Sequence, residues 1–220
     1  EHHVGNMAKD ACHAGVYYDI LANIPKENDV KTAIVTVNMR SFTSEWIYSS
    51  LETALRKEQL FMKKAPVLYK RMLLAFKAYP IWSEDERWAI VRKGIENQTF
   101  TLPHPVPYHN AQEWDHIVAA NGTLYNGIQP SADSLSMACH YIKLFACQLN
   151  EQNPRVKDLD RIVTLCRRRG WQPVFNILAE NVDQIDSLCG PDLIYLLEQN
   201  TQYIANRYEP QGVIVVNNLK

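Results

Sequence analysis

The sequence predicts an α/β fold of three layers, in which a parallel sheet carries helices on both faces. Two observations support this prediction. Helical and strand-like segments alternate along the chain, which is the order of an open parallel sheet. The strand-like segments are almost continuously apolar, a pattern typical of strands that are buried on both faces. The 220 residues, 46% of them hydrophobic, suffice for one substantial core, so we expect a single domain over residues 1–220.

The first elements are a helix and a strand. Residues 7–24 carry apolar side chains at helical spacing, and Pro25 ends that periodicity. A polar turn follows and leads into residues 33–37, whose apolar, β-branched composition predicts a strand. This order predicts a helix that feeds directly into a buried strand.

Helices with strong start signals follow this strand. Their predicted ranges are 43–58, 66–79 and 83–97. Thr43 or Ser44 can cap the first of them, because a hydroxyl accepts a hydrogen bond from the free N–H groups of a first helical turn. Ser83 and Glu86 have the spacing of a capping box, which predicts the start of the third.

Helical periodicity disappears in residues 99–130, where prolines, histidines and aromatic residues gather. We expect an irregular aromatic insert, and a long insert in a compact domain is typically functional or mobile. If it closes over a pocket, its amphipathic side chains can stack on sugars or acyl chains, which makes Trp114, Tyr125 and Asn126 candidate substrate-binding residues. The spacing of its histidines matches no ligand motif, so we predict no metal site.

The last third of the chain repeats the helix and strand alternation. The predicted elements are helices at about 132–149, at 154–169 and at 191–208, and strands at 172–178 and 212–217. Three arginines at 167–169 precede Gly170, and cations there complement the dipole of a helix that ends at the glycine. We therefore interpret this basic run as a helix end and not as a phosphate site.

Composition excludes several classes of partner and cofactor. The formal net charge of −1 and the isoelectric point near 6.7 leave no global basic field, so we expect no nucleic acid partner. Five widely spaced cysteines contain no CxxC pair, which disfavours a metal or dithiol redox site. No glycine-rich phosphate-binding run is present, which counts against a nucleotide-binding domain of the flavodoxin type. We predict no cofactor.

The residues after the strand at 33–37 are the best candidates for a site. Parallel sheets place their chemistry just beyond the carboxyl ends of the strands, and Asn38 and Arg40 stand there. This rule supports the location of a site more strongly than it supports any one reaction.

Three segments carry a resemblance to a known family. The runs VGNMAKDACHAGVYYDIL and TAIVTVNMRSFTSEW resemble the second and third conserved blocks of SGNH hydrolases. They are similar above all to divergent members related to the membrane-associated protein that assists D-alanyl transfer to lipoteichoic acid. The later run RIVTLCRRRGWQPVFNILAENV also resembles these relatives. The resemblance implies an SGNH-like, flavodoxin-like three-layer sheet.

The resemblance also implies an ester chemistry. In that family a serine attacks an ester, a backbone amide and an asparagine bind the oxyanion, and a late Asp-x-x-His supplies the base. Matched by position, Asn38 is the side-chain donor and Ala8, or its neighbour Met7, the backbone donor. Arg40 is then a candidate contact for an anionic or polar group of the substrate. The expected substrate is a small-molecule or glycan ester, or a lipid-linked polymer.

The sequence departs from the family at both ends. No Gly-Asp-Ser precedes Asn6 and no Asp-x-x-His follows Gly212. We expect that the domain is incomplete at both ends and that the catalytic serine and histidine lie outside these residues. The resemblance favours the cell envelope or periplasm and a membrane-anchored parent protein. The alternative is a non-catalytic glycan-binding or assembly module on the same fold.

Overall fold

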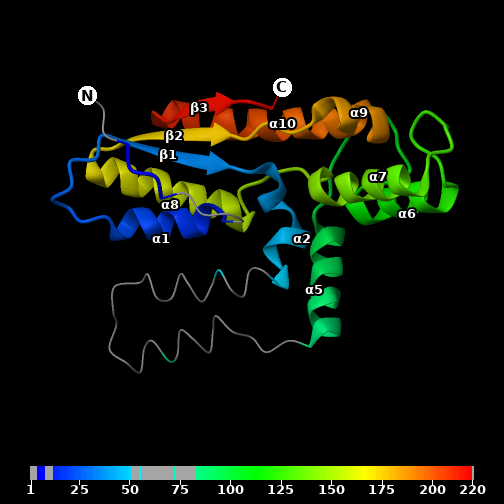
Figure 1. Ribbon diagram of the computed structural model, residues 1–220, viewed down its shortest axis with the longest axis horizontal. Coiled ribbons are helices and arrows are strands. Elements are labelled where there is room, and N and C mark those ends of the chain that lie inside the picture. Colours follow the sequence, from blue (N-terminus) through cyan, green and yellow to red (C-terminus); the bar gives the residue numbers. More distant parts are fainter. Residues whose placement is uncertain (1–3, 8–11, 51–54, 56–71, 73–82, 220) are drawn as a thin grey trace.

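The computed structural model describes residues 4–7, 12–50, 55, 72 and 83–219. Its sheet contains the strands β1 (Thr32–Val37), β2 (Gln172–Ile177) and β3 (Ile214–Asn217) in the order β1-β2-β3. Both pairings are parallel, and Val35, Phe175 and Val215 stand in one row across the sheet (Figure 1). The α/β character and the parallel strands are confirmed. Within the described residues β2 is central and β1 is an edge strand.

The helices account for most of the described chain. They are α1 (Ala14–Asn23), α2 (Ser44–Ile47), α5 (Glu84–Asn97), α6 (Ala111–Asn121), α7 (Ala132–Phe145), α8 (Pro154–Arg169), α9 (Val182–Cys189) and α10 (Pro191–Tyr208). Ser83 and Glu86 form the predicted capping box of α5, and Gly170 ends α8 in the left-handed conformation after the three arginines. No helix in the described ranges is long and apolar enough to cross a membrane.

The helices that pack on the sheet cover one face of it, and the expectation of helices on both faces is wrong for the described residues. Val35, Phe175 and Ile177 point to the covered face and are at most 2% exposed. Tyr208 of α10 meets the Phe175 ring edge-on, with 5.0 Å between the centroids. On the other face Ile34 is 69% exposed. The strands therefore alternate between buried and exposed positions, although their composition is apolar on both sides.

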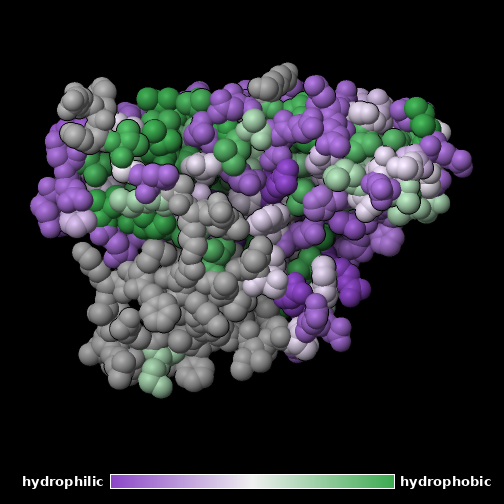
Figure 2. Space-filling model, in the orientation of Figure 1, coloured by the Kyte–Doolittle hydropathy of each residue, from purple (hydrophilic) through white to green (hydrophobic). Residues whose placement is uncertain are grey.

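The uncovered face is hydrophobic. Ile34 and Ile214 stand in one cross-strand row with Val174 between them, and Val216 follows in the next row. Figure 2 shows hydrophobic residues gathered over the region where Figure 1 draws the strands.

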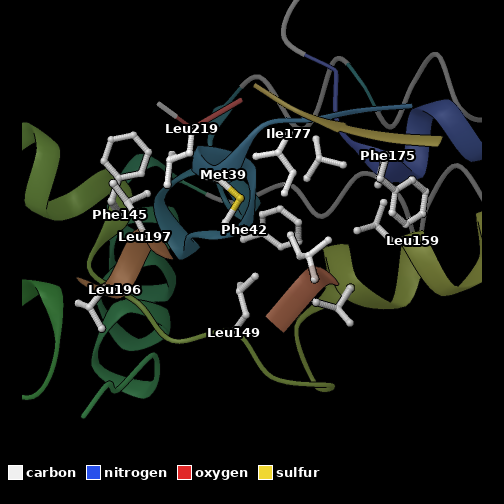
Figure 3. Close-up of a cluster of buried hydrophobic side chains, with 14 of the residues drawn as sticks. Met39, Phe42, Phe145, Leu149, Leu159, Phe175, Ile177, Leu196, Leu197 and Leu219 are labelled. Carbon is white, nitrogen blue, oxygen red and sulfur yellow. The ribbon is translucent and has the colours of Figure 1, made fainter. Parts of the chain in front are cut away.

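The turn after β1 is anchored in the hydrophobic core. This turn is a 3-10 helix, η1 (Met39–Phe42), and its Met39 and Phe42 side chains are 4% and 1% exposed. Figure 3 shows both of them among side chains of β2, α7, α8 and α10. Burial of this kind fixes where the chain leaves the sheet, because a displaced turn would expose both side chains.

Local capping explains where the structure differs from the predicted helix ends. The first helix begins at Ala14 and not at residue 7, because His13 is extended and its Nδ1 accepts a hydrogen bond from Gly15 N at 3.0 Å. The insert at 99–130 is not wholly irregular, since α6 lies within it. Asn110 caps α6 through the Glu113 N–H, and Gly122 ends it with a φ of 62°.

Some predicted elements differ in extent or lie outside the described residues. The predicted helix at 43–58 is interrupted, because α2 ends where Tyr48 leaves the helical conformation. Ser50 and Leu55 are again helical, and residues 51–54 and 56–58 lie outside the described residues. The helix expected at 66–79 lies outside the described residues, apart from Met72. The helix predicted at about 132–149 ends at Phe145, and α9 was not predicted.

Candidate functional site

The carboxyl ends of the three strands bring together polar residues that are far apart in the sequence. Asn38 follows β1, Glu180 lies three residues after β2, and Asn218 directly follows β3. Because the strands are parallel, these residues lie at one edge of the sheet, which we call the carboxyl edge. Asn218 Nδ2 donates to Ile177 O at 3.0 Å and to Asn176 Oδ1 at 2.8 Å, which ties β3 to β2 at this edge.

Asn38 caps the turn that follows β1. Its Oδ1 accepts a hydrogen bond from Arg40 N at 3.0 Å, and its backbone oxygen accepts one from Ser41 Oγ at 2.7 Å. A backbone N–H can only donate, so the side-chain atom that faces it must be the carbonyl oxygen. This contact sets the orientation of the amide and leaves Nδ2 as its donor group. Among the described residues, no acceptor is bound to Asn38 Nδ2, and the residue is half-buried.

Arg40 forms an ion pair across the carboxyl edge. Its Nε lies 3.3 Å from Glu180 Oε1 and its Nη2 lies 2.6 Å from Oε2, so the pairing is bidentate. The Glu180 side chain is 6% exposed and the Arg40 side chain 35%. The guanidinium also lies over the Phe145 ring, 5.5 Å from its centroid. The sequence predicts that Arg40 contacts the substrate. In the structure, a buried carboxylate already neutralises its guanidinium.

Two side chains from other elements hold the far end of the same turn. Gln98 Nε2 and Asn153 Nδ2 both donate to Phe42 O, at 2.9 Å and 2.8 Å. Gln98 Oε1 in turn accepts from Ser44 N at 2.7 Å. The residues between Asn38 and Ser44 are thus fixed at both ends, which is the kind of support that a preorganised donor needs.

The other predicted site residues do not gather at the carboxyl edge. Trp114 is 4% exposed and stacks on Tyr108, with 4.6 Å between the ring centroids. This placement makes it a core residue, and we leave it out of the candidate site. Tyr125 and Asn126 lie in the loop between α6 and α7, which Figure 1 shows well away from the end of β1.

The loop between α6 and α7 packs on the end of α9. A Cβ atom on Gly190 would lie 2.6 Å from the Tyr125 ring, so the ring fits closely against this glycine. Asn126 is exposed, and its Oδ1 accepts from Ile128 N at 3.1 Å within the loop. Ala8, the predicted backbone donor, lies outside the described residues, and its neighbour Met7 is 51% exposed.

A second polar cluster joins the insert to α10, and no local sequence motif predicts it. Asp192 Oδ2, in the first turn of α10, accepts from Tyr108 OH at 3.2 Å and lies 3.3 Å from His104 Nε2. Burial raises the pKa of the Tyr108 hydroxyl, and the negative charge of Asp192 raises it further. The hydroxyl therefore keeps its proton and remains a hydrogen-bond donor. The sequence shows that these residues can form hydrogen bonds and ion pairs. It does not show that they are neighbours, because the insert and α10 are far apart in the chain.

The insert also borders an open groove of about 480 Å³, which we call the insert groove. It is lined by Glu96, Pro107, Asn110, Gln112, Glu113, His116 and Ile117. Gln112 Oε1 is buried and has no hydrogen-bond partner within the described residues. No three His, Cys, Asp or Glu side chains of the described chain are grouped so that they could hold a metal ion.

Comparisons with known proteins identify no relative of this chain. It matches no protein-family model, no curated protein and no solved structure.

Proposed function

We propose that the carboxyl edge is the oxyanion-binding side of an acyl-ester site in an SGNH-like esterase or acyltransferase. The observation that carries the proposal is the orientation of the Asn38 amide, because Arg40 N engages its oxygen and leaves its Nδ2 to donate. The parallel pairing of β1, β2 and β3 supports the α/β sheet that an SGNH-like domain requires. Resemblance to the SGNH blocks supplies the reaction class.

The reaction requires more than one donor. Attack of a hydroxyl on an ester carbon makes a tetrahedral intermediate, whose negative oxygen is stabilised by preorganised N–H groups. Asn38 Nδ2 is one such group, held by the cap at one end of the turn. We assign neither the nucleophile nor its base to a residue of this chain. The substrate class remains a glycan ester or a lipid-linked ester, in the cell envelope as the resemblance implies.

The test uses a protein expressed from its complete reading frame and a p-nitrophenyl ester as probe. Asn38→Asp keeps the oxygen that accepts from Arg40 N and removes the Nδ2 donor. We expect kcat to fall by about 10²–10³-fold, the loss typical of one oxyanion donor. An unchanged kcat would exclude Asn38 from this role.

Asn150→Asp is the matched control. Asn150 Oδ1 accepts from Gln152 N at 2.9 Å, the same contact to the second following residue that Asn38 makes, and it lies between α7 and α8. The control carries the same new charge at an exposed position and keeps the same type of hydrogen bond, so its kcat should equal that of the parent protein. A fall in both variants would assign the loss to charge and not to the donor.

The insert groove favours a second candidate function, a non-catalytic glycan-binding module. Amide and carboxylate groups line it, and the buried Gln112 Oε1 can accept a hydrogen bond from a sugar hydroxyl. Titration calorimetry with a soluble oligosaccharide tests this function. Binding that is lost in Gln112→Ala and retained in Asn38→Asp, with no ester hydrolysis by the parent protein, selects the binding module.

A further inference from the structure

We propose that Arg40 and Glu180 are positioning residues, which hold the Asn38 amide in the orientation that lets Nδ2 donate. The inference rests on the proposed function and adds a pair that the resemblance did not point to. Arg40 contributes twice: its backbone N–H binds Asn38 Oδ1, and its side chain binds Glu180. One residue thus links the donor after β1 to the segment after β2.

The geometry of the pair suits a fixed support. Two parallel N–H···O contacts define both the distance and the plane of the guanidinium, which a single contact does not. The Glu180 carboxylate is nearly fully buried, and Phe145 bounds the guanidinium on another side. A buried carboxylate without its cation is strongly unfavourable, so Arg40 is held where Glu180 requires it.

The direction of the coupling follows from the chain. Asn38 and Arg40 are two residues apart, and Ser41 N and Oγ both bind the Asn38 backbone oxygen. A shift of the Arg40 backbone therefore moves the hydrogen atom that Asn38 Oδ1 accepts. Without the ion pair, the Asn38 cap would depend on the turn and on its buried Met39 and Phe42 side chains, and the amide would exchange between orientations more often.

The chain contains a second bidentate pair that serves as a control. Arg207 Nε and Nη2 bind Asp160 Oδ1 and Oδ2 at 3.0 Å and 2.8 Å, between α10 and α8. Its Arg side chain is 29% exposed, close to the 35% of Arg40. Its carboxylate differs, because the Asp160 side chain is 34% exposed and the Glu180 side chain 6%. The pair contacts neither Asn38 nor η1, so Arg207→Gln removes a bidentate ion pair without touching the candidate site.

Glu180→Gln is the informative variant, because it leaves no buried charge and keeps the half-exposed Arg40. We would measure amide hydrogen exchange at Arg40 N, the group bound to Asn38 Oδ1. We expect exchange to become about tenfold faster, because the local opening is less costly without the ion pair. Exchange at Gln152 N, which is bound to Asn150, should not change. In Arg207→Gln, Arg40 N should exchange at the parent rate.

Two results would overturn the inference. One is parent-like exchange at Arg40 N in Glu180→Gln, and the other is equal acceleration in Glu180→Gln and Arg207→Gln, which would indicate a loss of global stability only. The exchange measurement does not depend on a reaction. It therefore tests the positioning role even if the protein hydrolyses no ester and the proposed function fails.

Kinetics then test whether the positioning matters for catalysis. In the ester assay, Glu180→Gln should lower kcat about tenfold with little change in KM, since misalignment of a donor affects the transition state. In an Asn38→Ala background the same substitution should have no further effect, because the group that it positions is gone. Additive losses in the double variant would mean that Glu180 does not act through Asn38.

Discussion

Two isoleucines on opposite faces of the same sheet provide the sharpest test of the fold. Ile177 of β2 is fully buried, and Ile34 of β1 is 69% exposed. Replacement by alanine removes three carbons in each case, at about 0.8 kcal/mol per buried CH₂. For Ile177 this transfer loss of about 2.4 kcal/mol is joined by a cavity term, so the free energy of unfolding should fall by roughly 3–4 kcal/mol. Only about a third of the Ile34 side chain is buried, so its replacement should lower the free energy of unfolding by less than about 1 kcal/mol.

Equilibrium unfolding in urea, followed by tryptophan fluorescence, measures both losses. Ile34 lies on an edge strand and Ile177 on the central one, so their strand propensities can differ by about 1 kcal/mol. The expected difference of at least about 2 kcal/mol exceeds that range, so it reports burial. We expect the Ile177→Ala midpoint to shift at least three times as far as that of Ile34→Ala, with equal slopes. Equal midpoint shifts would contradict the one-sided burial of the sheet, because they would mean that the face around Ile34 is covered as fully as the other.

Three further predictions concern buried polar groups and one turn. Burial raises the pKa of the Cys147 thiol to about 12, so the unfolded chain loses this proton first as the pH rises. The free energy of unfolding should therefore be constant below pH 9 and fall as the pH rises towards 12, and the fall should be smaller in Cys147→Ala. Asn200→Ala should cost about 3 kcal/mol in urea unfolding, because Asn200 Oδ1 and Nδ2 satisfy the buried Leu149 N–H and Cys147 C=O. Gly190→Ala should lower the melting temperature, because Gly190 has a φ of 83° and a new Cβ would lie 2.6 Å from the Tyr125 ring. An unchanged melting temperature would contradict both the positive φ and the close contact with the ring.

The position of Asn38 could be predicted from the sequence, whereas the state of Arg40 could not. An apolar run that ends in Asn38 indicates a strand end, and the rule for parallel sheets then places the residue at the carboxyl edge. Glu180 stands after the next strand by the same rule, yet its pairing with Arg40 joins residues 140 apart in the chain. No local pattern reports such a pairing, because it depends on which strands are neighbours.

Composition alone also misplaced Trp114. A tryptophan in a segment rich in proline and histidine resembles a binding residue, and the helical turn that buries it begins at a single capping residue, Asn110. Its ring is covered by Tyr108, which precedes the cap in the chain. The stacking partner of an aromatic ring is a tertiary contact, so exposure could not be deduced from residue type.

Local sequence patterns were enough to predict the helices with clear caps, the three strands and the position of Asn38 at a strand end. These features follow from periodicity and from hydrogen bonds within a few residues, which are local. The uncovered sheet face, the pairing of Arg40 and the burial of Trp114 can be seen only in the folded chain. Each of these depends on which surfaces meet, and an apolar strand such as β1 has the same composition whether one of its faces is covered or both.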